Sequence, residues 1–229
     1  MVLPASRTIN VRTEASPVAA VVPNAIGAFT NKYVIVFYLV SFIGVNYSSN
    51  FVKKIMRYVA FLRGINVGGH KIIKMPELTE IFLSFGLENV KTLLQSGNVL
   101  FDWSKATNTS VVKKLETGLL KKLGYEVKVL VRTIPEVEAI LHANPFGTIK
   151  EGSDIKLYVT FLPEPAKEQP VLPYVSKKDG FEIIAITGQE IYTVAHRLPD
   201  GRYGSLGYIE KTFGKYSTTR NWNTVMKLV

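Results

Sequence analysis

From residue 57 onward, short β-rich runs alternate with stretches whose apolar residues recur at helical spacing. In the first helical stretch Leu78, Ile81 and Phe85 fall on one face. The expected order is strand, helix, strand, strand, helix, strand, over Arg57–Leu62, Pro76–Phe85, Val90–Leu94, Val99–Trp103, Ser110–Leu123 and Glu126–Val131. This βαββαβ order is typical of a ferredoxin-like fold.

A second, less complete set of elements follows. We expect a helix over Glu136–His142, strands over Ile155–Leu162, Phe181–Thr187 and Glu190–His196, and helices over Ser205–Phe213 and Thr219–Leu228. Pro163–Pro173 is expected to be a loop. The chain is therefore predicted to be an α+β protein of two packed ferredoxin-like halves, 56–133 and 134–229. A structural duplication is expected, without a repeat at the level of residues.

Residues 1–55 differ from the rest of the chain. Their apolar run, Tyr33–Val45, has 13 residues, whereas a membrane-spanning helix needs about 20. We expect 1–55 to be an extension outside the fold, with Met56 as the effective start of the protein. A targeting leader, a weak membrane anchor and a packed accessory helix remain open, and membrane association is not favoured.

The composition limits the chemistry. With 47% hydrophobic and 20% charged residues the chain resembles ordinary globular proteins. The absence of cysteine excludes disulfides, thiolate zinc sites and a cysteine nucleophile, and it fits a reducing, cytoplasmic location. The three histidines have no metal-ligand spacing, so we predict neither a metal site nor a cofactor.

The formal net charge is +10, of which residues 1–56 contribute +4 through five cations and Glu14. An excess of positive charge raises the local concentration of anions, nucleic acid included. The partners expected are therefore a phosphate-bearing small molecule or nucleic acid.

Three motifs stand out along the chain. Leu62–Gly69 has the sequence LRGINVGG, Leu94–Val99 has LQSGNV, and Thr219–Val225 has TRNWNTV. Together, in this order and spacing, they resemble a mainly bacterial family called domain of unknown function 1697, over about Met56 to Val229. The resemblance implies a ferredoxin-like α+β fold. It implies no established activity, cofactor or catalytic residue.

The first two motifs are expected to meet at one edge of the sheet. In a βαββαβ unit the first strand ends where the second and third strands are joined, so Arg63–Lys71 and Gln95–Asn98 should be neighbours; we call these two segments the loop edge. Glycine-rich turns can present backbone amides to an anion, and the third motif adds an arginine near a helix start. The simpler interpretation is that these residues only form turns and brace loops. The candidate ligand-binding residues are Arg63, Asn66, Gly68, Gly69, Lys71, Gln95, Ser96, Asn98, Arg220 and Asn223.

Three functions remain open. The preferred hypothesis is a protein that binds a phosphate-bearing ligand or nucleic acid at the loop edge. The alternatives are a small-molecule enzyme that uses the same edge, with catalytic residues unknown, and a structural or oligomeric module of undetermined oligomeric state. Glu210 is expected on a solvated helix face.

Overall fold

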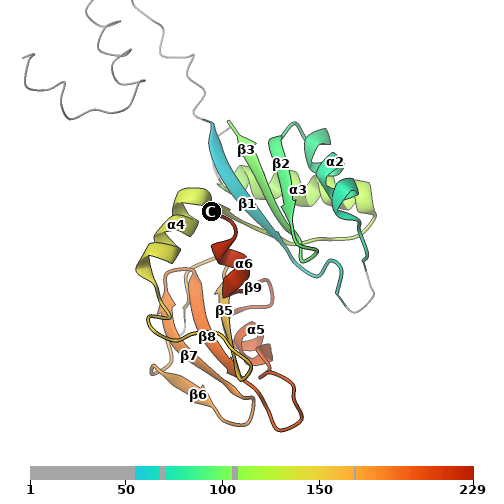
Figure 1. Ribbon diagram of the computed structural model, residues 1–229. Helices are drawn as coiled ribbons and strands as arrows, with labels where there is room; N and C mark the ends of the chain where they lie inside the picture. Colours follow the sequence, from blue (N-terminus) through green and yellow to red (C-terminus); the bar gives the residue numbers. More distant parts are fainter. Residues whose placement is uncertain (1–54, 68–70, 105–107, 168) are drawn as a thin grey trace, which may run out of the picture. The chain divides into compact units, whose positions relative to one another are not determined.

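The structure is a computed structural model that describes residues 55–67, 71–104, 108–167 and 169–229. These residues form helices and two antiparallel sheets, of four and five strands (Figure 1). The α+β class is thereby confirmed.

The first sheet has the strand order β2-β3-β1-β4. Its strands are β1 (Met56–Leu62), β2 (Glu88–Leu93), β3 (Asn98–Trp103) and β4 (Val129–Thr133). Two helices pack on one face of it, α2 (Met75–Ser84) and α3 (Asn108–Leu123). The order of these elements along the chain is the predicted βαββαβ order.

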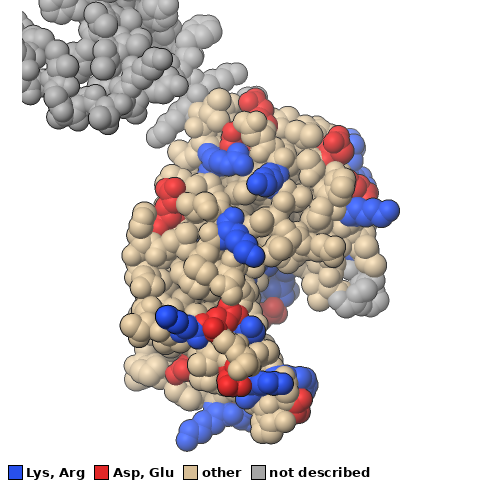
Figure 2. All heavy atoms as spheres, viewed as in Figure 1, with Lys and Arg blue, Asp and Glu red and all other residues tan. Residues whose placement is uncertain are grey.

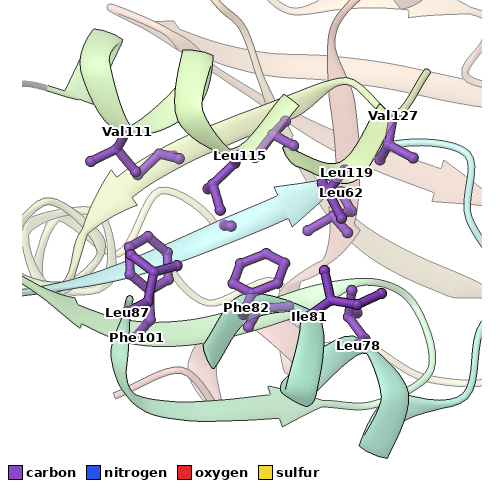
Figure 3. Close-up of a cluster of buried hydrophobic side chains, with 14 of the residues drawn as sticks. Leu62, Leu78, Ile81, Phe82, Leu87, Phe101, Val111, Leu115, Leu119 and Val127 are labelled. Atoms are coloured by element: carbon purple, nitrogen blue, oxygen red, sulfur yellow. The ribbon is translucent and has the colours of Figure 1, made fainter. Parts of the chain in front are cut away.

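Both faces of the first sheet are buried, because β1 alternates apolar residues toward each side. Tyr58, Ala60 and Leu62 join the core under the helices, whereas Val59 and Phe61 join a second core on the opposite face. Figure 3 shows side chains of α2 and α3 converging in the first of these cores. Apart from Arg57, β1 is an apolar strand with a core on each side, which places it at the centre of the fold.

The second sheet has the order β6-β7-β8-β5-β9. Its strands are β5 (Ile155–Phe161), β6 (Tyr174–Ser176), β7 (Phe181–Thr187), β8 (Glu190–His196) and β9 (Thr218–Asn221). Helix α5 (Gly207–Phe213) contributes Ile209 to a small core with Phe181 and Ile183. Thus α5 packs against this sheet as α3 packs against the first.

The two sheets share the second core. It joins Val59 and Phe61 of β1 to Val159 and Phe161 of β5. Helices α4 (Ile134–Ala143) and α6 (Trp222–Met226) also pack against this core. The faces that a ligand could otherwise reach are therefore covered where the sheets meet.

Two predicted elements need correction. The helix expected over Thr219–Leu228 starts only at Trp222, because Thr218–Asn221 pair with β5 as strand β9. The Asn221 side chain accepts from the amide of Asn223 and so caps α6. Strand β6 was not predicted, since it has only three residues in a proline-rich stretch.

The expectation that no residue-level repeat exists is wrong. Tyr58–Leu62 has the sequence YVAFL and Tyr158–Leu162 has YVTFL. The repeated strands have matching neighbours: β1 lies between β3 and β4, and β5 lies between β8 and β9. The registers match as well, with Arg132 opposite Val59 and Arg220 opposite Val159. Sequence and pairing together indicate an internal duplication.

Other expectations remain predictions. These are the ferredoxin-like character of each half and the domain boundaries at 56 and 134. The predictions for residues 1–54 lie outside the described residues. Among those described, no helix is long and apolar enough to cross a membrane.

Candidate anion-binding site

Two buried arginines occupy equivalent places in the two halves. Arg132 on β4 donates from Nε to Oε1 of Glu190 at 3.0 Å and from Nη2 to the carbonyl of Leu162 at 3.0 Å. Arg220 on β9 donates from Nε to Oδ1 of Asn98 at 2.6 Å and from Nη2 to the carbonyl of Leu62 at 2.8 Å. Each guanidinium group thus donates a hydrogen bond to a carbonyl at the end of the central strand of the other half, β5 for Arg132 and β1 for Arg220.

The surroundings of the two guanidinium groups also match. Phe61 and Phe161 stack with ring centroids 4.3 Å apart between the sheets. Arg220 lies over Phe61 and Arg132 lies over Phe161, each with Cζ 5.5 Å from the ring centroid. The faces of aromatic rings are negative, so each ring favours the cation beside it.

The two arginines differ in the charge of their partners. Glu190 balances Arg132 within a buried ion pair, whereas Asn98, in the equivalent position, is neutral. Burial lowers the pKa of Arg220 to about 10, so the group stays protonated at neutral pH. Within the described part of the chain no carboxylate forms an ion pair with Arg220. A net positive charge therefore lies at the base of the loop edge.

Arg63 lies next to this charge. Its two terminal nitrogens bind the two carboxylate oxygens of Glu210 at 3.0 and 2.9 Å, and Nη1 also donates to the carbonyl of Ser217. Arg220 binds the next two residues, through the Thr218 hydroxyl and the Thr219 carbonyl. Both arginines therefore converge on 217–219. Glu210 lies on the exposed face of its helix, as expected, and is also the partner of Arg63.

More positive charge surrounds Tyr216, whose side chain is about half exposed. Lys128 Nζ lies 5.5 Å and Lys215 Nζ 5.2 Å from the centre of its ring. The carboxylate of Glu116 raises the pKa of Lys128, which keeps that ammonium group charged. Beside Tyr216, the Ser217 hydroxyl is buried and has no hydrogen-bond partner among the described residues. Two cations thus lie at Tyr216, which directly precedes the residue whose carbonyl Arg63 binds.

Asn66 joins the two segments of the loop edge. Its Oδ1 accepts from the amide of Ile73 at 2.8 Å, and its Nδ2 donates to the carbonyl of Gln95 at 3.0 Å. The amide of Leu62 also donates to the carbonyl of Gly97 at 2.8 Å. The first and second motifs are therefore neighbours, and the Asn66 amide is occupied in holding them.

Asn98 and Ser96 form the inner part of the loop edge. The Asn98 side chain is fully buried and donates to the carbonyl of Leu93 and to the hydroxyl of Ser96. Asn98 therefore positions Arg220 and Ser96 and is itself inaccessible. Gln95 and Ser96 are exposed, so they are the polar side chains of the second motif that a ligand can reach.

Two other candidate residues, Lys71 and Asn223, lie differently from Arg63. Lys71 Nζ donates to the carbonyl of Glu126 at 3.2 Å and lies over the Tyr125 ring. Asn223 binds the carboxylate of Glu151, as does Asn221, at a separate polar cluster. Gly68 and Gly69 lie outside the described residues.

The sequence interpretation missed Lys128, Glu210, Tyr216 and Ser217. Only the repeat carried a usable signal: it places Arg220 and Arg132 at equivalent positions and so draws attention to the unequal partners Asn98 and Glu190. No local pattern links Glu210 to Arg63, which precedes it by 147 residues.

Fold and site together define an α+β protein in which two antiparallel sheets pack on a shared core, with a polar edge centred on arginine side chains. The chain belongs to the family described as "Protein of unknown function (DUF1697)", whose model matches residues 55–192. The third motif lies beyond this match.

A solved structure supports the fold assignment. It is described as the structure of conserved bacterial protein SP0830 from Streptococcus pneumoniae. The two chains are 23% identical with a TM-score of 0.54, over 76% of this chain and 96% of the other, so the similarity is one of fold. No curated protein matches the chain.

Proposed function

We propose that this protein binds an anionic, phosphate-bearing ligand at the loop edge, with Arg63 as the principal contact. The observation that carries the proposal is the unequal charge of two otherwise matching sites. The carboxylate of Glu190 neutralises Arg132, whereas Arg220 has only neutral partners. A bound anion would supply the negative charge that the second site lacks.

The roles of the residues follow from their exposure. Arg220 and Asn98 are buried, so they act on a ligand through the electrostatic field and by positioning the strand ends, where low polarity strengthens charge interactions. Arg63, Ser96 and Gln95 are accessible and can donate hydrogen bonds directly. Lys128, whose ammonium group contacts Glu116 and the Tyr216 ring, adds a further cation near 217–219.

Glu210 indicates the geometry in which an anion would bind. Its two oxygens meet two nitrogens of Arg63, which is the arrangement that guanidinium groups also adopt with phosphate. The Glu210 side chain is 49% exposed, so an incoming anion can displace it. Glu210 therefore acts in the proposal as an internal competitor for the ligand.

Calorimetric titration of the full chain with inorganic phosphate and with pyrophosphate tests this function. Arg63→Gln removes a charged hydrogen-bond donor worth about 1.5 to 3 kcal/mol, so affinity should fall roughly ten- to a hundredfold. Glu210→Gln removes the competitor, and affinity should rise roughly two- to fivefold.

Lys177→Gln serves as the control, because it removes one exposed cation from a turn of the second half. It should leave both affinities unchanged. If neither anion binds the wild type, or if Arg63→Gln binds both as well as the control does, the proposal is refuted and Arg63 is a structural brace.

A further inference from the structure

A groove in the first half lies apart from the loop edge and has a different charge pattern. It runs between the end of α2 and the helix α3, with a volume of about 690 Å³. Its lining residues are Ser84, Phe85, Ser110, Lys113, Lys114, Thr117, Gly118, Lys121 and Lys122. Four of these are cations and none is acidic, and we call this feature the lysine groove.

The floor of the lysine groove depends on Gly118. A Cβ atom at this position would lie 2.5 Å from Cζ of Phe85, so only glycine allows the ring to lie this close to α3. Glu116, the acidic residue of α3, binds the amide of Val129 and the ammonium of Lys128 on the strand side of the helix. The positive charge of the groove is therefore not neutralised by its own helix.

The lining of the lysine groove differs in charge pattern from the face drawn in Figure 2. On the face shown in Figure 2, basic and acidic side chains lie interspersed. The lysine groove instead combines basic side chains with the hydroxyl-bearing Thr117 and no carboxylate. Such a lining is complementary to a polyanion.

The spacing of the lysines indicates the kind of polyanion. Lys113 and Lys121 are eight residues apart on α3, a distance of roughly 12 Å at 1.5 Å per residue. This distance exceeds the separation of neighbouring phosphates on one strand, so the two ends of the groove would meet different phosphates of one backbone. A single small phosphate could contact only one end.

We propose that the lysine groove binds the sugar-phosphate backbone of nucleic acid without reading its sequence. Lysine ammonium groups are point charges that contact phosphates and carry no information about bases. This site is separate from the loop edge. The lysine groove would bind a polyanion, whereas the loop edge would bind a small anion. Binding should therefore depend steeply on salt and little on base composition.

The test uses fluorescence anisotropy of a labelled oligonucleotide, single-stranded and duplex, with the full chain between about 50 and about 200 mM salt. The variant Lys121→Gln/Lys122→Gln removes two groove cations and keeps good helix-forming residues. Its salt slope should fall by about 1 to 2, and its affinity at low salt should fall roughly tenfold or more.

The control Lys177→Gln/Lys178→Gln removes the same charge from an exposed turn and should keep the wild-type slope. Equal losses in both double variants would mean that binding follows net charge alone, and the proposal would fail. It would also fail if Arg63→Gln weakened binding as much as Lys121→Gln/Lys122→Gln, since the loop edge would then hold the oligonucleotide. Groove-dependent binding to anionic lipid vesicles without binding to oligonucleotides would assign the surface to membranes instead.

Discussion

At the scale of single residues, Arg132 and Arg220 contrast two ways of keeping a guanidinium group inside a protein. They are 6% and 8% exposed and have similar backbone acceptors. The ion pair of Arg132 with Glu190 balances the buried charge, so removing either side chain lowers the free energy of unfolding more than it would without the pair. Arg220 relies on neutral acceptors and on the Phe61 ring.

The contrast predicts unequal effects of the same substitution. Arg132→Met strands the Glu190 carboxylate inside the protein, and it should lower the free energy of unfolding by about 3 to 5 kcal/mol. Arg220→Met strands only neutral oxygens, for a smaller cost of about 1 to 3 kcal/mol. Urea unfolding of the two variants provides the measurement.

Each variant is the control for the other, because the side chains replaced have the same size and similar burial. An equal or larger loss for Arg220→Met would contradict the account. It would mean that the charge of Arg220 is balanced in a way that its neutral hydrogen-bond partners do not reveal.

At the scale of elements, each half contains a strand that is followed directly by a helix, with no linker residue between them. Thr133 ends β4 and caps α4, and Asn221 ends β9 and caps α6. In α4 the cap is reciprocal: Thr133 accepts from the amide of Glu136 at 3.3 Å, and Glu136 accepts from the amide of Thr133 at 2.6 Å. Such a capping box holds the start of a helix.

Thr133→Ala should therefore destabilise the protein by about 1 kcal/mol, because it removes the side-chain acceptor for the amide of Glu136. Thr133→Ser keeps the hydroxyl and should retain most of the stability. Thermal unfolding of the pair measures the difference, and equal melting temperatures would show that the box contributes nothing.

Helices and strands with strong hydrophobic periodicity could be predicted from the sequence. Short strands that form only because a neighbouring strand pairs with them could not. The helical spacing of Leu78, Ile81 and Phe82 gave α2 to within a residue or two. Residues 218–221 form a strand because β5 offers a partner, which no local pattern reveals. That error also misplaced Asn223. If both residues lay on one helix, Asn223 would be a neighbour of Arg220, three positions earlier. In the structure Arg220 lies in β9 and Asn223 in α6, so the two side chains are separated.

The candidate site was predictable to the same limited extent. Topology alone brought Arg63 near Gln95 and Asn98, because strand ends meet at one edge of the sheet. The burial of Asn98 and Arg220 follows from the packing of one sheet on the other, so the sequence pattern could not separate buried residues from accessible ones.

At the scale of the whole molecule, residues from Met56 onward supply the described members of the cores that bury β1 and β5. A shortened chain that begins at Met56 should therefore unfold cooperatively and remain soluble. Circular dichroism during heating compares it with the full chain. A broad transition without a midpoint in the shortened chain would show that the preceding residues are needed for folding.

Each half provides an arginine whose guanidinium group binds the other half, and this reciprocal contact limits how the protein can change over evolution. Leu62 and Arg220 are 158 positions apart along the chain, yet they share one hydrogen bond. An inherited change at Arg220 thus disturbs the end of β1. Its compensation is expected at Asn98, whose side chain is the acceptor, because the Leu62 acceptor is a backbone carbonyl that any residue supplies. Covariation among relatives should accordingly link position 98 with 220 and position 190 with 132. A change that makes position 98 acidic should abolish the proposed binding of an anion at the loop edge.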